Sequence, residues 1–204
     1  MSEESQFQEF SDKYTKTGRA GQWLLGNFYG AVSSLITSID MRSGQALEIG
    51  AGQGYSTSYI RKTLHEKVQF QASELEPEQV RMASMRNPDV PIRTESVYEL
   101  QGEDKSIDLV IMLEVLEHLE EPETALSEIS RVTRQYAILS VPREPIWRIL
   151  NFARGKYWKS LGNTPGHINH WSARGFRKFV EPYFKVVEFR TPLPWIILLL
   201  KPRD

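Results

Sequence analysis

The sequence predicts an α/β fold with a mainly parallel sheet and helices on both of its faces. Three observations indicate it: short apolar segments alternate with helical patterns, a glycine-rich turn follows the first apolar segment, and two apolar runs near the C-terminus flank a proline-containing turn. Such alternation is typical of parallel sheets, because parallel strands need a crossover element between them. At 204 residues the chain is long enough for one domain with a sizeable core, rather than two.

The expected elements follow one another in a regular order. An amphipathic helix over residues 20–39 comes first. After it, strands are expected over 46–50, 68–73, 91–94, 107–113 and 136–141, with helices over 56–65, 77–86 and 122–132 between them. The pattern is then irregular until Ser172, a good N-cap for a helix over 173–181. Two further strands, over 184–189 and 195–200, are expected to form a hairpin and bring the sheet to seven strands.

The composition excludes several classes of function. The chain has no cysteine, so disulfides, thiolate metal sites and cysteine nucleophiles are excluded. A formal net charge of −1 gives no electrostatic reason to expect duplex nucleic acid as a partner. The acidic start of the chain lacks an apolar segment, and the apolar run over 195–200 is too short to cross a bilayer. We therefore expect no signal peptide and a cytoplasmic location.

A glycine-rich turn is the strongest functional signal. Glu48, Gly50, Gly52 and Gly54 occupy every second position at the end of a short apolar strand. Glycine adopts positive φ and has no Cβ, so a ligand can lie against the backbone there. The helix that follows points its free N–H groups at the same place. The spacing departs from the dinucleotide pattern G-x-G-x-x-G, because Tyr55 stands where the last glycine is required.

An acid at the end of the second expected strand narrows the choice of ligand. Glu74 lies 20 residues after Gly54, where a carboxylate that binds ribose hydroxyls is expected. The ligand should therefore carry a ribose, but it need not carry a pyrophosphate.

The order of these motifs resembles that of the class I S-adenosylmethionine-dependent methyltransferases. Four motifs occur in the same order as in that family: the turn over 46–54, the acidic strand end over 73–80, the "EVLEH" turn within 107–119 and the strand over 136–142. The chain is similar to the type 11 and type 12 groups, which include small-molecule and quinone-biosynthesis methyltransferases. The resemblance implies a Rossmann-like fold with an antiparallel hairpin at the sheet edge. It also implies S-adenosylmethionine as cofactor, S-adenosylhomocysteine as product, and in-line methyl transfer to a small-molecule acceptor.

The motifs and the resemblance together give a set of expected cofactor-binding residues. Glu48 lies in an apolar strand end, where an unpaired carboxylate is costly, so it should accept hydrogen bonds from the turn amides. Glu95 and Ser96 match the place where the family recognises adenine, and Glu114 should lie near the amino acid part of the cofactor. The full expected set is Glu48, Gly50, Ala51, Gly52, Gly54, Glu74, Leu75, Glu95, Ser96 and Glu114.

Three histidines are candidates for a catalytic base. His118 follows the fourth expected strand, so its ring faces either the methyl-transfer centre or its own turn. His167 and His170 either line a substrate pocket or hold a loop in place. With no third nitrogen or sulfur ligand nearby in the sequence, these two make a poor zinc site, and we expect no metal.

Residues 143–171 form the most individual segment. Its part over 143–159 holds five basic residues and one acid, interleaved with aromatic residues. Three interpretations remain open: a lid over the active site, a helix on a membrane surface that reaches a lipid-like acceptor, and a packed helix with a solvated basic face. We divide the expected single domain into a helical cap (1–43), a cofactor-binding core (44–142), this variable segment, and a C-terminal helix and hairpin (172–204). In the cap, Tyr14 and Arg19 are candidates for closing over the cofactor's carboxylate.

Two other functions are compatible with the motifs. One is a regulatory module that binds S-adenosylmethionine without catalysis, which the intact run of motifs opposes only weakly. The other is a nicotinamide-dependent oxidoreductase, which Tyr55 opposes because it replaces the last glycine of the dinucleotide pattern.

Overall fold

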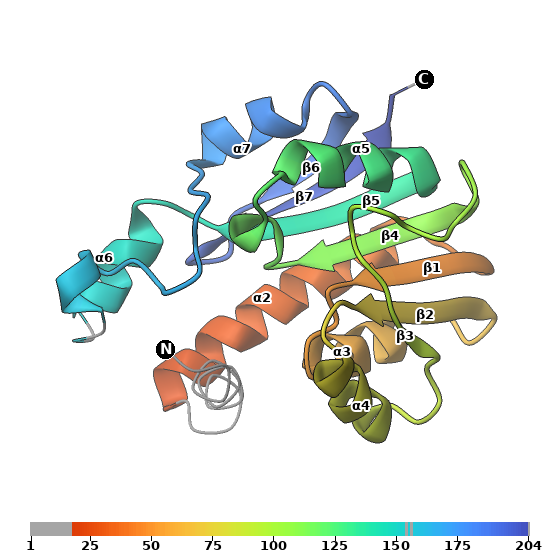
Figure 1. Ribbon diagram of the computed structural model, residues 1–204, viewed down its shortest axis with the longest axis horizontal. Helices are drawn as coiled ribbons and strands as arrows, with labels where there is room; N and C mark the ends of the chain where they lie inside the picture. The colour runs from red at the N-terminus through yellow and green to blue at the C-terminus, as the bar shows by residue number, and fades with distance from the viewer. Residues whose placement is uncertain (1–17, 154, 156, 204) are drawn as a thin grey trace.

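The computed structural model describes residues 18–153, 155 and 157–203. Its sheet has seven strands in the order β3-β2-β1-β4-β5-β7-β6 (Figure 1). The first five strands pair in parallel, whereas β7 runs antiparallel to both β5 and β6. The predicted α/β fold, with its mainly parallel sheet and C-terminal antiparallel hairpin, is confirmed.

The element bounds agree closely with the expected ones. The strands are β1 (Gly44–Ile49), β2 (Val68–Glu74), β3 (Ile92–Thr94), β4 (Ile107–Leu113), β5 (Thr133–Pro142), β6 (Phe184–Arg190) and β7 (Trp195–Pro202). The α-helices are α2 (Arg19–Ser38), α3 (Tyr55–Thr63), α4 (Pro77–Arg86), α5 (Pro122–Val132), α6 (Ile146–Ala153) and α7 (Ala173–Val180). Two short 3₁₀ helices are η1 (Leu116–His118) and η2 (Trp158–Ser160).

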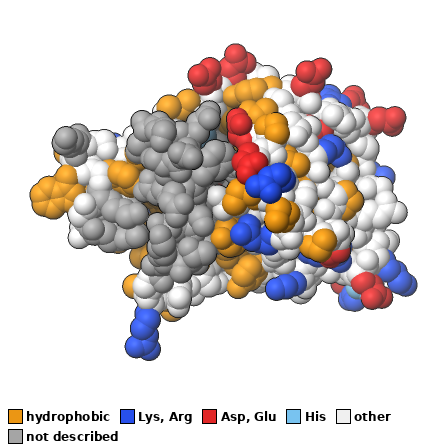
Figure 2. Space-filling model, turned by 60° about the horizontal axis from the view of Figure 1, so that its bottom comes forward, with side chains coloured by type: hydrophobic (Ala, Val, Ile, Leu, Met, Phe, Trp, Pro, Cys, Tyr) orange, Lys and Arg blue, Asp and Glu red, His pale blue; other side chains and the backbone are white. Residues whose placement is uncertain are grey.

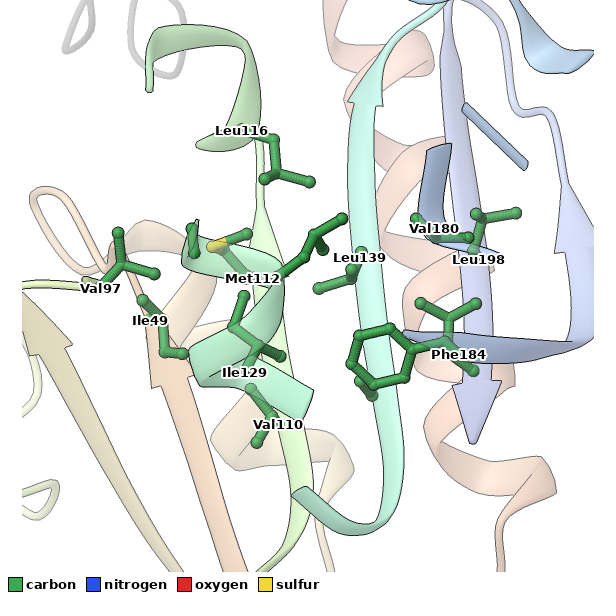
Figure 3. Packing of buried hydrophobic residues seen from close by; sticks show 14 of the residues in the cluster. Ile49, Val97, Val110, Met112, Leu116, Ile129, Leu139, Val180, Phe184 and Leu198 are labelled. Carbon is green, nitrogen blue, oxygen red and sulfur yellow. The ribbon is translucent and has the colours of Figure 1, made fainter. Parts of the chain in front are cut away.

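Alternate residues of the central strands enter two separate cores, one on each face of the sheet. In β4, Val110 and Met112 pack with α5 and α7, as Figure 3 shows from close by. Leu109 and Ile111 point to the other face and pack with α2 and α3. Every residue of β4 is buried, which is why residues 109–113 form a continuous apolar run rather than an alternating pattern.

The largest difference from the expected bounds is at the start of β5. The sequence predicts a strand from residue 136, but pairing begins at Thr133. Arg134 and Gln135 are polar, so their sequence gives no apolar signal, yet both donate to the buried carboxylate of Asp108 at 2.7 and 2.6 Å. A tertiary ion pair therefore extends the strand beyond its apolar part.

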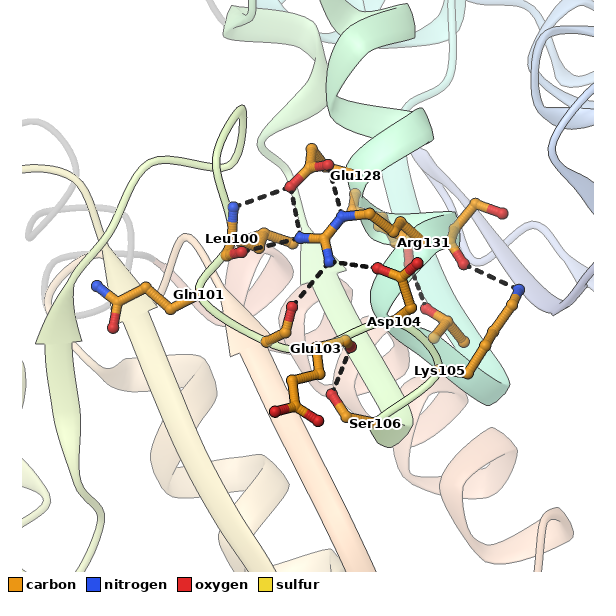
Figure 4. A network of polar contacts seen from close by, with 12 residues as sticks. Leu100, Gln101, Glu103, Asp104, Lys105, Ser106, Glu128 and Arg131 are labelled. Carbon is orange, nitrogen blue, oxygen red and sulfur yellow. Dashed lines mark hydrogen bonds and ion pairs between the residues drawn. The ribbon is translucent and has the colours of Figure 1, made fainter.

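The loop before β4 is held by one guanidinium. Arg131 of α5 binds Glu128 on its own helix, Asp104 at 2.8 Å, and the carbonyl oxygens of Leu100 and Gly102, both at 2.9 Å (Figure 4). The Glu128 and Asp104 carboxylates raise the pKa of this guanidinium above its usual value, so it stays charged. The network fixes the chain that leads into the central strand.

Candidate active site

The glycine turn connects β1 to α3 and is fastened to the end of β2. Its three glycines all have positive φ, between 53° and 80°. The amides of Gly50 and Ala51 donate to the carbonyl oxygen of Ser73 at 2.9 and 3.0 Å. The amide of Gly52 donates to Oε2 of Glu74 at 2.7 Å. The turn is thus held against the second strand, with its backbone in a conformation that few other residues adopt.

The predicted role of Glu48 needs a correction. The amides of Gly50, Ala51 and Gly52 donate to Ser73 and Glu74 instead, because β1 and β2 pair in parallel and end side by side. Glu48 is only 1% exposed, and this burial raises the pKa of its carboxyl to about 7, although the hydroxyl groups of Ser56 and Thr57 oppose the shift. Glu48 is therefore buried against the start of α3, and its place among the cofactor-binding residues stays a prediction.

We expect Glu48→Gln to stabilise the protein at pH 8 but not at pH 4.5. The folded state holds a proton on Glu48 up to about pH 7, whereas the unfolded chain loses it near pH 4.5. The contribution of this group to stability therefore falls as the pH rises between these values. Removing the charge should add about 2–3 kcal/mol to the free energy of unfolding at pH 8. Urea unfolding at both pH values measures it.

The exposed Glu66 offers a matched control for this change. Glu66→Gln should leave the free energy of unfolding nearly the same at both pH values. An equal gain for Glu48→Gln at pH 4.5 and pH 8 would show that the buried charge is not the cause.

Glu74 lies at the end of β2, directly beside the glycine turn. Besides the amide of Gly52, its carboxylate accepts from the amides of Leu75 at 2.7 Å and Glu76 at 3.3 Å. A carboxylate has about four acceptor positions, so the described residues occupy three of them. The side chain of Leu75 is 57% exposed and offers apolar surface next to this acid.

Glu114 lies at the end of β4, close to the carboxyl end of β5. It has a positive φ of 60°, which is uncommon for a residue other than glycine. Its Oε1 accepts from the hydroxyl of Ser140 at 3.0 Å, and its Oε2 accepts from Nε1 of Trp195 at 2.6 Å. The sequence predicts Trp195 only as the start of a buried strand, so its place beside a site acid comes from the antiparallel pairing of β7 with β5.

Two of the three candidate histidines lie together. The ring centroids of His118 and His167 are 4.8 Å apart, and Nδ1 of His118 lies 3.0 Å from the carbonyl oxygen of Gly166. His170 has a different neighbour, because its Nδ1 lies 3.7 Å from Oε1 of Glu144. His167 and His170 are close in sequence but have different neighbours: His167 contacts His118 in the turn after β4, and His170 lies near Glu144.

Comparison with known proteins gives these features a family. Residues 47–141 match the family model described as a methyltransferase domain. They hold the glycine turn, Glu74 and Glu114. These residues form a class I S-adenosylmethionine-dependent methyltransferase domain. S-adenosylmethionine is accordingly its cofactor.

The individual proteins that are similar to this chain have low sequence identity to it. An uncharacterized 37.1 kDa protein in transposon TN4556 of Streptomyces fradiae is 31% identical over 119 residues, or 56% of this chain and 34% of that protein. The chain thus spans about a third of the length of this curated relative.

Several solved structures have the same fold as this chain. The magnesium protoporphyrin IX methyltransferase of Synechocystis PCC 6803 with bound S-adenosylhomocysteine has a TM-score of 0.74 at 16% identity, over 98% of this chain and 95% of that one. The PH0226 protein of Pyrococcus horikoshii OT3 has a TM-score of 0.74 at 14% identity, over 98% and 99%.

We predict that the adenosyl group of the cofactor binds beside Glu74 and Leu75. Two ribose hydroxyls can donate to Glu74 if they use its fourth acceptor position and replace the longest of its three bonds, the one from the amide of Glu76. Leu75 presents apolar surface beside this acid for a planar base. These assignments remain predictions, as do those for Gly50, Ala51, Gly52 and Gly54.

Glu95 and Ser96, the residues expected to bind adenine, both have hydrogen-bond partners within the protein. Glu95 is buried, and its carboxylate binds the guanidinium of Arg93 at 3.0 Å and the amide of Gln101 at 2.9 Å. To recognise adenine, this carboxylate would have to leave Arg93. Ser96 accepts from the amide of Tyr98 at 3.2 Å and closes a local turn.

Residues 143–171 contain a helix, as two of the three interpretations of this segment expect. α6 projects beyond the end of the sheet (Figure 1). Nε1 of Trp147 donates to Oγ1 of Thr164 at 2.9 Å, and Nδ2 of Asn151 donates to the carbonyl oxygen of Gly162 at 3.1 Å. Tyr14 lies outside the described residues, and Arg19 is exposed at the start of α2.

Proposed function

We propose that this protein transfers the methyl group of S-adenosylmethionine to a small-molecule acceptor by in-line displacement. The observation that carries the proposal is that two acids, Glu74 and Glu114, lie at the carboxyl ends of β2 and β4, on either side of β1, whose end continues into the glycine turn. Ligands of open α/β sheets bind at this edge. The methyl group is activated by the sulfonium of the cofactor, so the protein mainly aligns the reactants and excludes water. Such alignment is worth about 7–11 kcal/mol.

A row of aromatic rings supports an apolar or aromatic acceptor. Phe28, Trp195, Trp147, His167 and His118 form consecutive ring contacts, with centroid distances between 4.8 and 5.9 Å. The row passes Glu114, which binds Trp195 directly. Phe28, Trp195 and His167 are buried, so Trp147 and His118 are the rings of this row that offer surface to a planar or aliphatic molecule.

A hydroxyl acceptor also needs a base, and His118 and His167 are the residues that we assign to this role. We expect His118→Ala and His167→Ala to lower the single-turnover rate by about 100-fold or more, as loss of a general base does. His170→Ala is the matched control, because His170 lies beside Glu144 instead. Full rates in all three variants would show that no histidine is the base.

The proposal is tested by binding and turnover together. Calorimetry should show binding of S-adenosylhomocysteine and none of NAD. Cofactor with a labelled methyl group should then label phenolic or polyprenyl acceptors. Binding of S-adenosylhomocysteine without transfer to any acceptor would favour the regulatory module. Binding of NAD alone would favour an oxidoreductase.

A membrane surface is a second candidate partner, favoured by the projecting end of the variable segment. Ile149, Phe152, Trp158 and Leu161 are all exposed there, and the rings of Phe152 and Trp158 stack at 4.9 Å. Figure 2 shows hydrophobic side chains at the same end of the molecule. The five basic residues over 143–159 suit anionic headgroups. None of the described helices is long and apolar enough to span a membrane. We propose a cytoplasmic protein whose variable segment touches the membrane surface.

Replacing Phe152 and Trp158 together by serine should weaken binding to phosphatidylglycerol vesicles by at least about tenfold, because two apolar side chains are lost from the interface. Sedimentation with vesicles measures it. Val187→Ser, at an exposed position of β6, is the control. Equal binding by the double variant and the control would remove this surface from the proposal.

A further inference from the structure

A mixed group of two imidazoles and one carboxylate lies at the carboxyl end of the central strand. Glu117, His118 and His167 each present a ligand atom, and these atoms all lie within 4.8 Å of one another. His118 and Glu117 come from η1, whereas His167 comes from the chain after α6. In the sequence, His167 is close to His170, and no third ligand is nearby. The tertiary structure brings His167 to Glu117 and His118 instead.

The two segments that carry the ligands are held together by several hydrogen bonds. The amides of Ile168 and Asn169 donate to the carbonyl oxygen of Glu117 at 2.9 and 3.1 Å. Nδ2 of Asn169 donates to the carbonyl oxygens of Leu116 and Leu119 at 3.2 and 2.6 Å. The backbone positions of all three ligands are therefore fixed before a ligand binds, which lowers the entropic cost of binding.

The orientation of each imidazole suits a metal ligand. The carbonyl oxygen of Gly166 only accepts, so Nδ1 of His118 carries the proton and Nε2 carries the lone pair. Histidines that bind a metal through one nitrogen commonly donate the proton of the other to a backbone carbonyl, which fixes the ring. His167 is 7% exposed and stacks on Trp147 at a centroid distance of 5.9 Å, which fixes its ring.

The chemistry of the group selects the kind of ion. Glu117 is 1% exposed, so a nearby positive charge lowers the cost of burying its negative charge. Two imidazoles and a carboxylate form a donor set that suits Zn²⁺ and related divalent transition metals better than Mg²⁺ or Ca²⁺. Ligand atoms around tetrahedral zinc lie about 3.4 Å apart, so the ligand atoms of the group must move closer together when a metal binds, and the exposed His118 has room to turn.

We propose that Glu117, His118 and His167 form a divalent transition-metal site beside the methyl-transfer centre. The site leaves coordination positions for an oxygen of the acceptor, and metal coordination lowers the pKa of such a hydroxyl. The chemical role rests on the proposed function, whereas metal binding does not. When metal is bound, the two imidazoles act as ligands, and the loss of rate in their variants reports loss of the metal.

The test uses Co²⁺ alone as the probe, because its visible absorption reports ligand number and type. Protein freed of metal by a chelator should bind one equivalent. His167→Ala, His118→Ala and Glu117→Gln should each weaken binding by at least about tenfold. His170→Ala should bind as the wild type does. Absence of binding to the wild type, or equal weakening in His170→Ala, would overturn the proposal.

Two further measurements keep the result clear. Binding of S-adenosylhomocysteine shows that each variant is folded. If the wild type binds S-adenosylhomocysteine but not Co²⁺, the metal site is rejected and the proposed function stands. If the wild type binds Co²⁺ but not S-adenosylhomocysteine, the proposed function alone is rejected. Where a variant does not fold, ¹⁵N spectra of the wild type with Zn²⁺ decide instead. The ring signals of His118 and His167 should shift, and those of His65 and His170 should not; any other pattern counts against the site.

Discussion

Gly54→Ala is expected to destabilise the protein and to abolish cofactor binding. Gly54 has a φ of 80° at the start of α3, which costs an alanine about 1–2 kcal/mol. A Cβ there would lie 2.9 Å from Cα of Ala83 in α4 and 2.5 Å from Nδ2 of Asn87. Because the contact with Ala83 is to backbone, α3 and α4 must separate, at a cost of about 1–3 kcal/mol more. Urea unfolding and calorimetry with S-adenosylhomocysteine measure the two effects.

Gly30→Ala provides the matched control. Gly30 lies inside α2, and a Cβ at this position has no neighbour within 4 Å. This substitution should stabilise the protein by about 0.5–1 kcal/mol, because alanine favours helix more than glycine does. If Gly54→Ala unfolds at the same urea concentration as the wild type, the close approach of α3 and α4 is not a constraint on the turn.

Glu74→Ala is expected to weaken the binding of S-adenosylhomocysteine by about 100-fold, with a smaller effect on stability. The carboxylate would lose its bonds to the ribose, and the amide of Gly52 would lose its acceptor at 2.7 Å. Hydrogen bonds to a charged group contribute about 1.5–3 kcal/mol each. Calorimetry measures the affinity, and circular dichroism measures the melting temperature.

Glu78→Ala is the control for this acid. Glu78 lies in the first turn of α4 and pairs with Arg81 at the surface, where an ion pair contributes little. Its loss should leave the affinity within about twofold of the wild type, since it only removes this exposed pair. Near-normal affinity in Glu74→Ala would remove Glu74 from the cofactor site.

Much of the fold follows from local sequence patterns. β4 and α5 occur at their expected residues, because a continuous apolar run and a helix opened by Pro122 are strong local signals. The first three residues of β5 were not expected, and the bounds of α6 were not predicted, although the sequence indicated a helix within 143–159. Arg134 and Gln135 pair through Asp108, and α6 is held by side chains such as Asn151, so their signals come from distant residues.

Part of the candidate site also follows from the sequence. Glu74 lies beside the glycine turn, as its spacing indicates. The partners of individual side chains do not follow, and Glu48 and Glu95 show why. Amides of the glycine turn donate to Ser73 and Glu74 rather than to Glu48, because β1 and β2 end side by side. Glu95 binds Arg93 because residues two apart in an extended chain point to the same side.

The sequence by itself determined the order of strands and helices, the glycine turn and the acid that follows it. These features depend on the conformations of neighbouring residues and on burial periods of two or 3.6 residues. Only the tertiary structure decided which side chains meet. Trp195 binds Glu114 through antiparallel pairing, and His167 reaches His118 through the hydrogen bonds of Asn169. Contacts between residues far apart in the chain depend on strand order and loop packing, which no local pattern records.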